Sequence, residues 1–283
     1  MGCMTETIRH QGTMLGKDAG SSLRPLVWDQ GRLWVHPLHA GWLRKLGLTT
    51  AASLWGLPEG IVYRQVPGRT TRRVTLGDGE LARTVFIKQH AVCRWYERCK
   101  SWLQGKRAVW GAVPEWEALW LCGQQQIPTL EPILCAQCAR GSLLMTSALE
   151  GCEPLDHWWQ RQPAEDERRQ TLMQLAQLLQ RFHRMGWHHQ DLYLCHVLRR
   201  QSPPHQLYLI DLGRAQRMSW PVTRWIVKDL AQLYYSTRCW RRTEWLRFWR
   251  LYRGRPLSSE RRLWGAIQRK AARIAHHSQK HRL

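Results

Sequence analysis

The pattern of apolar and polar positions predicts short strands in the first half of the chain. Three β-prone runs cover residues 61–66, 72–76 and 84–89, and Gly-Asp-Gly at residues 77–79 separates the last two. Glycine and aspartate are the residues that tight hairpin turns favour, so this segment predicts a β-hairpin. A further strand is expected at residues 142–146.

Helical patterns follow. The proline at position 114 is suited to the first turn of a helix, which is predicted to cover residues 114–126. Residues 165–185 predict a second helix, because apolar side chains recur on one face: Leu172, Leu175, Leu178, Leu179 and Phe182. That stripe indicates a helix packed against a core. The apolar run at residues 207–210 predicts a buried strand.

The remaining segments show weaker patterns. Residues 1–22 mix Gly, Ser and charge without periodicity, which predicts a disordered tail. Residues 23–59 predict a short helical or irregular lead-in to the strands. Residues 150–155 (EGCEPL) predict a linker. The chain is therefore expected to divide into a strand-rich part, residues 23–149, and a helix-rich part, residues 150–283.

Two carboxylates lie in short motifs in the helix-rich part. Residues 189–196 read HQDLYLCH, and residues 209–213 read LIDLG. Kinase-like enzymes carry H-R-D-x-x-x-x-N and then D-F-G; the first aspartate accepts the hydroxyl proton and the second binds Mg²⁺. Asp191 is therefore the candidate base, and Asp211, at the end of a predicted buried strand, is the candidate metal ligand. Each motif alone is short enough to occur by chance.

Two further residues occur in the order that a kinase requires. Lys88 ends a β-prone run, and Glu115 lies in the first turn of the helix predicted from residue 114. In kinases a strand lysine binds the α- and β-phosphates, and a helix glutamate pairs with it. Glu117 is an alternative partner, but it points about 200° around the helix from Glu115. The order of these elements predicts an α+β, protein-kinase-like fold with a small β-rich N-lobe and a mostly helical C-lobe.

The catalytic segments also resemble one family. Residues 186–198 (GWHHQDLYLCHVL) and 210–216 (IDLGRAQ) are similar to the bacterial lipopolysaccharide core heptose kinases of the WaaP type, whose stretches run close to G-x-N-H-R-D-x-Y-x-C-H-F-L and I-D-L-H-R-A-Q. The resemblance covers about residues 60–255. It includes Lys-Asp-Leu at residues 228–230 and implies that Asp229 braces the catalytic loop.

The chain departs from the family pattern at four positions in these segments: His188, Gln190, Val197 and Gly213. None of these departures removes a group that performs phosphoryl transfer. His196 stands where most kinases have asparagine, and the resemblance implies that it helps to bind the metal. Because Mg²⁺ prefers oxygen ligands, His196 could instead hydrogen-bond Asp191 or the phosphate.

The chain lacks a G-x-G-x-x-G loop over the nucleotide. Residues 64–73 contain one glycine, Gly68, and four arginines. Gly68 and Arg69 are therefore the candidate nucleotide contacts of this segment. The alternative is that Arg69, Arg72 and Arg73 form a solvated strand edge.

The resemblance implies an enzyme that uses ATP and Mg²⁺ to phosphorylate a heptose hydroxyl of the lipopolysaccharide inner core. The residues alone argue only for transfer from ATP to an alcohol. A kinase of another core sugar, such as keto-deoxyoctulosonate, fits the same motifs, and a non-catalytic, membrane-associated pseudokinase is a third candidate. A protein kinase fits less well, because no A-P-E segment follows Asp211. Arg214 is expected to contact an anionic acceptor or phosphate, or to form a buried structural ion pair.

Charge adds a prediction about partners. Lys and Arg number 43 against 21 Asp and Glu, which gives a formal net charge of +22, and residues 217–283 hold 17 Lys or Arg and only three acids. The same region contains Trp220, Trp225, Trp240, Trp245, Trp249 and Trp264, and residues 241–250 predict an amphipathic surface helix. Tryptophan and basic residues favour anionic membrane surfaces. Nucleic acid is the alternative partner, but the chain carries no recognised nucleic-acid-binding motif.

The expected location follows from three features. No window approaches the ~18 uninterrupted apolar residues of a membrane span. The nine cysteines show no regular spacing of the kind that disulfide frameworks have, and the N-terminus shows no signal sequence. Both features predict a protein of the reducing cytoplasm. Zinc is not expected, because Cys135-x-x-Cys138 lacks a second ligand pair. We therefore expect a cytoplasmic protein associated peripherally with the inner face of the inner membrane.

Overall fold

The strand-rich part of the chain forms one antiparallel sheet. The computed structural model describes residues 24–92, 111–220 and 222–280, so the tail predicted at residues 1–22 lies outside the described residues. Seven strands lie in the order β1-β2-β6-β7-β5-β4-β3. They are β1 (Leu26–Trp28), β2 (Leu33–Val35), β3 (Ile61–Val66), β4 (Arg69–Leu76), β5 (Arg83–Ala91), β6 (Pro132–Cys138) and β7 (Gly141–Ser147).

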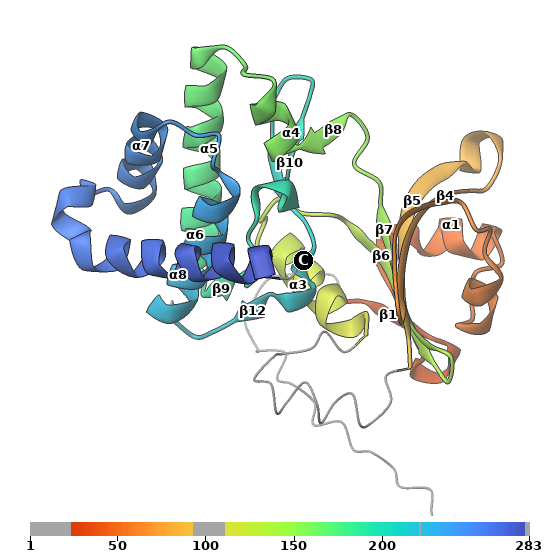
Figure 1. The fold of residues 1–283 in the computed structure, drawn as a ribbon. Coiled ribbons are helices and arrows are strands. Elements are labelled where there is room, and N and C mark those ends of the chain that lie inside the picture. The colour runs from red at the N-terminus through yellow and green to blue at the C-terminus, as the bar shows by residue number, and fades with distance from the viewer. Residues whose placement is uncertain (1–23, 93–110, 221, 281–283) are drawn as a thin grey trace, which may run out of the picture.

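Helices lie on the two faces of this sheet (Figure 1). α1 (Ala40–Lys45) packs on the outer face, where Val85 and Ile87 of β5 are fully buried in the same cluster. α3 (Val113–Gln124) lies on the inner face, toward the helical part. Because side chains alternate along a strand, Lys88 of β5 points to the same face as α3.

The predicted hairpin is confirmed. β4 and β5 pair antiparallel, with Leu76 opposite Arg83, and the Gly-Asp-Gly segment begins the connection between them. Gly77 has φ +81°, and a Cβ added there would lie 2.7 Å from the carbonyl oxygen of Leu81. This turn therefore requires glycine.

The lead-in differs from its prediction. Residues 23–59 contain α1, but they also supply β1 and β2, which extend the sheet beside β6. Each of these strands has three residues, too few for an alternating pattern to show in the sequence. The expectation of a helical or irregular lead-in was therefore wrong for these strands, and β6 was not predicted.

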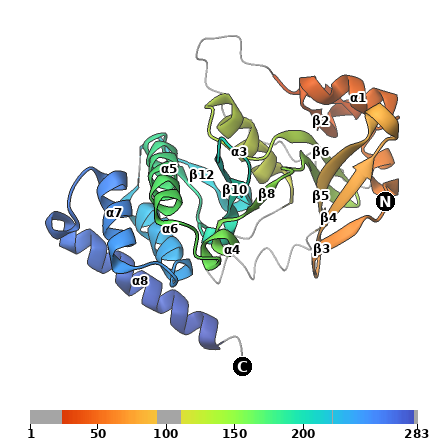
Figure 2. The same ribbon diagram turned by 90° about the horizontal axis from the view of Figure 1, so that it is seen from above.

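The helical part follows the linker that leaves β7. Its helices are α4 (Leu155–Gln160), α5 (Glu165–Arg184), α6 (Thr223–Ser236), α7 (Arg242–Arg253) and α8 (Arg261–Lys280). Its short strands are β8 (Cys152–Pro154), β9 (Trp187–His188), β10 (Val197–Arg200), β11 (Leu207–Leu209) and β12 (Gln216–Arg217). The helices predicted at 114–126 and 165–185 correspond to α3 and α5. Figure 2 shows the helical part beside the sheet, with α7 on the side remote from it.

The amphipathic helix predicted at residues 241–250 is α7, but its apolar face is not free. Trp245, Phe248 and Trp249 belong to the core of the helical part, where α7 packs against α5. The apolar stripe of α5 thus has a protein partner. Of the six C-terminal tryptophans, Trp220 is the one largely exposed, at 69%. Trp245 and Trp249 of α7 are therefore not available to lipid.

Within the described ranges, no helix combines the length and apolar character needed to cross a bilayer. The architecture is an α+β, protein-kinase-like fold, as the sequence predicted. Its sheet carries Lys88 and its helical part carries both carboxylate motifs, so the candidate site lies where the two parts meet.

Candidate active site

A buried carboxylate on α6 holds the loop that carries Asp191. Asp229 is 0% exposed, and it accepts hydrogen bonds from the backbone N–H groups of His189 (2.8 Å) and Gln190 (2.7 Å). Gln190 has φ +62°, a conformation that a residue with a Cβ adopts at some cost in energy. The contacts from Asp229 hold the backbone in this turn immediately before Asp191.

Two further side chains on the same face of α6 extend this support. The amide of Gln232 accepts from the N–H of Leu192 and donates to the carbonyl of Gln190, both at 3.1 Å. The hydroxyl of Ser236 accepts from the N–H of Leu194 at 2.9 Å. The role of Asp229 was predicted from the sequence, whereas those of Gln232 and Ser236 were not. The available signal was their spacing of three and then four positions from Asp229, which places all three on one helical face.

His189 connects the two carboxylate motifs. Its Nε2 donates a hydrogen bond to the carbonyl oxygen of Ile210 at 3.0 Å, directly before Asp211. Asp211 itself has φ +56°, in the left-handed region that aspartate visits more readily than most residues. The imidazole thus fixes the distance between the catalytic loop and the backbone that presents the second carboxylate.

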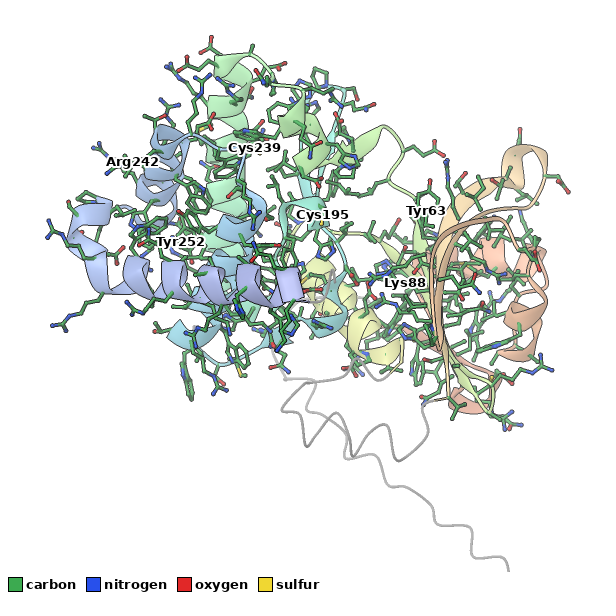
Figure 3. All side chains as sticks on the ribbon, viewed as in Figure 1. Tyr63, Lys88, Cys195, Cys239, Arg242 and Tyr252 are labelled. Carbon is green, nitrogen blue, oxygen red and sulfur yellow. The ribbon has the colours of Figure 1, made fainter. Side chains whose placement is uncertain are left out.

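Lys88 lies between Glu115 and Asp211. Its Nζ is 2.5 Å from Oε1 of Glu115 and 3.3 Å from Oδ1 of Asp211. Burial lowers the pKa of Lys88, but the two carboxylates outweigh burial and the pKa is raised above its ordinary value. The amine is therefore held as a cation. In Figure 3, Lys88 lies on the side of the sheet that faces the helical part.

Arg69 reaches the same carboxylate from β4. Its guanidinium is 3.3 Å from Oδ1 of Asp211, and its side chain is 22% exposed. The alternative of a solvated strand edge therefore fails for Arg69, and also for Arg72, which is buried. Gly68 precedes Arg69 in the turn between β3 and β4, with φ +75°. The structure thus brings Arg69 to the site and places Gly68 in the adjoining turn.

The cations around Asp211 keep it ionised. Burial raises the pKa of Asp211, but Lys88, Arg69 and His196 hold that pKa well below its ordinary range. A half-buried carboxylate that stays charged is suited to receive a cation. Oxygen ligands of this kind are the ones Mg²⁺ prefers.

His196 lies between the two aspartates. Its Nδ1 donates to the backbone carbonyl of Asp191 at 2.7 Å, and its Nε2 is 3.9 Å from Oδ2 of Asp211. Ligand atoms of Asp191, His196 and Asp211 lie within 4.8 Å of one another. Burial lowers the pKa of His196, but hydrogen bonds to Cys195 and to the Asp191 carbonyl, with the charge of Asp211, raise it to about 9. A metal ion could use Nε2 only by displacing its proton.

Arg214 is placed beside the candidate base. Its guanidinium is 3.7 Å from Oδ1 of Asp191, and its side chain is 52% exposed. A buried structural ion pair, one of the two expectations for Arg214, is therefore excluded. The exposed guanidinium remains available to an anion that approaches Asp191.

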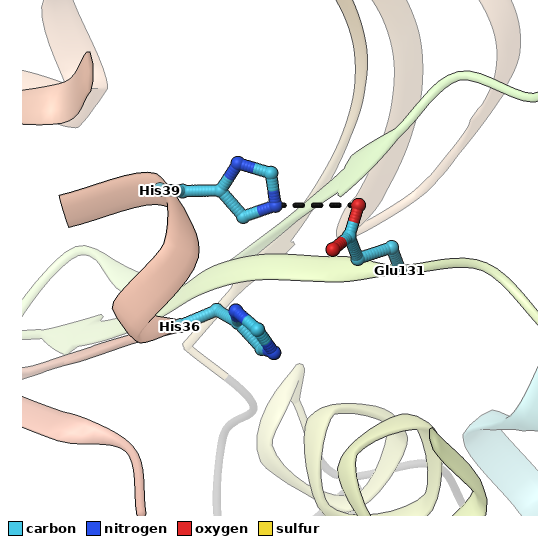
Figure 4. Close-up of side chains that lie close together, drawn as sticks. All are labelled: His36, His39 and Glu131. Atoms are coloured by element: carbon cyan, nitrogen blue, oxygen red, sulfur yellow. Dashed lines mark ion pairs between the residues drawn. The ribbon is translucent and has the colours of Figure 1, made fainter. Parts of the chain in front are cut away.

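A second group of candidate ligands lies at the sheet, apart from the two carboxylate motifs. His36, His39 and Glu131 lie close together (Figure 4), with His39 Nε2 3.4 Å from Glu131. The N–H of Leu38 donates to Nδ1 of His36, and Arg83 donates to Nδ1 of His39, both at 3.3 Å. Nδ1 of both rings therefore accepts a hydrogen bond from the protein. The contact between His39 and Glu131 joins the lead-in to the residue before β6.

Comparison with known proteins agrees with this geometry. Residues 28–252 match the profile described as the lipopolysaccharide kinase (Kdo/WaaP) family. The chain belongs to this family. Family membership confirms the resemblance seen in the catalytic segments and makes the chain a phosphotransferase that acts on an alcohol group, with ATP as the phosphoryl donor.

Two individual relatives and one solved structure are similar to this chain. The lipopolysaccharide core heptose(I) kinase WaaP of Pseudomonas aeruginosa is 31% identical over 243 residues, covering 79% of this chain and 89% of the relative. The protein of the same name from Escherichia coli K12 is 28% identical, covering 78% and 90%. A solved structure titled "WaaP in complex with acyl carrier protein" is 27% identical with a TM-score of 0.66, covering 89% of this chain and 99% of that one.

Proposed function

We propose that this kinase transfers the γ-phosphoryl group of ATP to a heptose hydroxyl of the lipopolysaccharide core. The observation that carries the chemistry is that Asp191 and Asp211, from separate motifs, lie close together. Lys88, paired with Glu115, reaches Asp211 from the sheet. The heptose acceptor is inferred from the curated relatives, which are named heptose(I) kinases.

Each residue has a defined task in this reaction. Asp191 accepts the proton of the acceptor hydroxyl, whose oxygen then forms a bond to the γ-phosphorus as the bond from phosphorus to the β-γ bridging oxygen breaks. Lys88 binds the nucleotide phosphates, and Glu115 holds Lys88 in position. Arg69, with Gly68 in the adjoining turn, covers the phosphates in place of a glycine-rich loop. The products are ADP and a sugar phosphate, and the proton leaves on Asp191.

The residues at the site fit a divalent cation. Asp211 offers an ionised carboxylate, and the Nε2 of His196 faces it, so these two side chains would hold Mg²⁺. When bound, Mg²⁺ neutralises charge on the phosphates. The hydrogen bond from His196 Nδ1 to the Asp191 carbonyl keeps the imidazole oriented toward Asp211.

The proposal is tested with the full-length protein, γ-labelled ATP and Mg²⁺ on dephosphorylated lipopolysaccharide core. Fragmentation mass spectrometry of the product then locates the phosphate. Label on a heptose is the expected result. Label on keto-deoxyoctulosonate would favour the second candidate function, which the family description supports because it names Kdo beside WaaP. ATP binding without transfer would favour the pseudokinase.

We also propose that the protein associates peripherally with the inner face of the inner membrane, where a lipid-linked acceptor would lie. Support comes from the net charge of +22 and from the exposed Arg241, Arg242 and Arg250 next to or on α7. Acyl carrier protein is the rival partner for this surface, because the similar solved structure contains it. Competition between anionic vesicles and acyl carrier protein for the purified protein distinguishes the two.

A further inference from the structure

Lys228 on α6 lies beside the catalytic loop and has no role in the phosphoryl transfer proposed above. Lys228 directly precedes Asp229, whose carboxylate is committed to the backbone of His189 and Gln190. The ammonium of Lys228 lies 5.4 Å from the ring centroid of Trp225, and the side chain is half-buried. Among the described residues, no hydrogen bond or ion pair engages this ammonium.

Other cations converge on the same place. Arg214 stands 3.7 Å from Asp191. The pKa of Lys228 lies below its ordinary value, chiefly because the side chain is partly buried. The charges of Asp229 and Asp191 raise this pKa, and those of Arg214 and Lys270 lower it.

The geometry of α6 gives the same location, because Lys228 precedes Gln232 by about one helical turn, and the amide of Gln232 contacts the backbone of Gln190 and Leu192 on either side of Asp191. α8, which carries Lys270, packs against α6, and Arg214 lies beside Asp191. The three cations are therefore on elements that border the part of the catalytic loop carrying Asp191.

Such a cluster is unfavourable by itself, because like charges repel and a half-buried ammonium loses hydration. An arrangement of this kind becomes favourable when an anion binds between the cations. The cluster is separate from the cations that serve the nucleotide. Lys88 and Arg69 contact Asp211, whereas Arg214 contacts Asp191.

We propose that Lys228, together with Arg214 and Lys270, binds an anionic group of the acceptor and thereby holds the acceptor hydroxyl against Asp191. This inference rests on the proposed function, since it names the substrate chemistry of the same site. The anion is a carboxylate or phosphate on a sugar next to the one that is phosphorylated. Trp225 supplies the flat face over which the ammonium of Lys228 is held.

An anionic anchor also explains how the site could select its acceptor. A neutral heptose offers only hydroxyl groups, which many sugars share. A carboxylate or phosphate at a fixed distance from the reacting hydroxyl provides an additional contact, and binding energy from such a remote group positions the reacting atoms. Lys228 is thus a positioning residue and not one that performs the transfer.

The test compares Lys228→Gln, Lys228→Arg and Lys270→Gln with the unsubstituted protein. Initial rates are measured at saturating ATP against core acceptor, and at saturating acceptor against ATP. Lys45→Gln is the matched control, because Lys45 is an exposed lysine on α1, in the strand-rich part and outside this cluster. Thermal unfolding confirms that each variant is folded.

The expected result for Lys228→Gln is a rise of about tenfold or more in KM for the acceptor, with KM for ATP within about twofold. Lys228→Arg should recover most of the loss and Lys270→Gln should show a smaller rise. Should Lys228→Gln not fold, Lys270→Gln decides. An unchanged KM for the acceptor overturns the inference, and so does an equal rise in KM for ATP, which would assign the cations to the nucleotide.

Chemically altered acceptors identify the anion. On a carboxyl-reduced acceptor, the unsubstituted protein should behave like Lys228→Gln if a carboxylate is the ligand. For phosphate, an acceptor that lacks only the phosphate on the reacting hydroxyl is compared with one that lacks every phosphate, and the same behaviour on the latter alone indicates that phosphate is the ligand. If neither alteration changes KM, the inference is wrong. Absence of any transfer by the unsubstituted protein overturns the proposed function and this inference together, whereas transfer without the KM effect overturns this inference alone.

Discussion

The buried carboxylate of Asp229 accepts a hydrogen bond from the backbone N–H of His189, 40 positions earlier in the chain. The same carboxylate accepts from Gln190, so α6 fixes the backbone that presents Asp191. The position of the candidate base thus depends on a residue that touches no substrate.

Replacement of Asp229 should therefore reduce both stability and turnover. Asp229→Ala leaves two buried N–H donors unpaired, and the expected loss is about 2–4 kcal/mol in the free energy of unfolding. Urea unfolding measures the loss of stability, and the rate of phosphoryl transfer should fall as well. Asp166→Asn is the control, because that side chain is 96% exposed. Wild-type stability and rate in Asp229→Ala would contradict the role assigned to α6.

The Lys88–Glu115 pair predicts a nucleotide-binding defect. Lys88→Ala should weaken ATP binding by about tenfold or more and also lower turnover, since it removes the cation expected on the phosphates. Glu115→Gln should have the same effect to a smaller degree, because it loosens the position of Lys88. Titration calorimetry with ATP measures both. Glu117→Gln, on the same helix, should bind ATP normally, and an equal defect there would contradict the pairing.

The basic surface at α7 predicts vesicle binding driven by charge. Because Trp245 and Trp249 are buried, the arginines must supply the attraction. Neutralising Arg241, Arg242, Arg247 and Arg250 should weaken association with anionic vesicles by about 1 kcal/mol per charge that lies near the surface, and less at high salt. Co-sedimentation measures binding. The control neutralises four exposed cations of the strand-rich part: Arg32, Lys45, Arg64 and Arg140. An equal loss of vesicle binding in both variants would contradict the assignment of membrane binding to the surface at α7.

His188 predicts a loss of stability in acid. Its side chain is fully buried and its Nε2 accepts from the N–H of Val222 at 3.2 Å. Burial, with a smaller contribution from His183, lowers the pKa of His188 from 6.5 to about 4. Between these values the unfolded chain binds the proton more readily, so the stability present above pH 6.5 declines as the pH falls toward 4.

The variant His188→Asn carries the residue typical of the family at this position. Its free energy of unfolding should fall by roughly 2–3 kcal/mol less than that of the unsubstituted protein between pH 6.5 and pH 4. Urea unfolding at a series of pH values measures it. His157→Asn, at an exposed position on α4, is the control. A pH profile of His188→Asn that parallels the unsubstituted protein would show that His188 is not responsible.

Much of this architecture could be predicted from the sequence because it depends on local patterns. The Gly-Asp-Gly turn at 77–79 and the apolar stripe of α5 each reflect the geometry of one element. The order of Lys88, Glu115, Asp191 and Asp211 was sufficient for the fold class, because a kinase-like site draws on these residues in that order.

Other features depend on contacts between distant segments. β1 and β2 have three residues each, and they exist as strands because β2 pairs with β6 and β1 pairs with β2. The sequence shows that α7 is amphipathic, but it cannot show whether its apolar face meets lipid or α5. The roles of Gln232 and Lys228 likewise depend on where α6 lies against the catalytic loop.

The central claim is that Asp191 accepts the proton of an acceptor hydroxyl. The most direct measurement is the single-turnover rate of phosphoryl transfer from γ-labelled ATP to lipopolysaccharide core by Asp191→Ala, together with its affinity for ATP. We predict that the rate falls by about 10²–10⁴-fold while ATP binds with nearly normal affinity, since Lys88 and Asp211 remain. Transfer at close to the unsubstituted rate would contradict the assignment of Asp191 as the base.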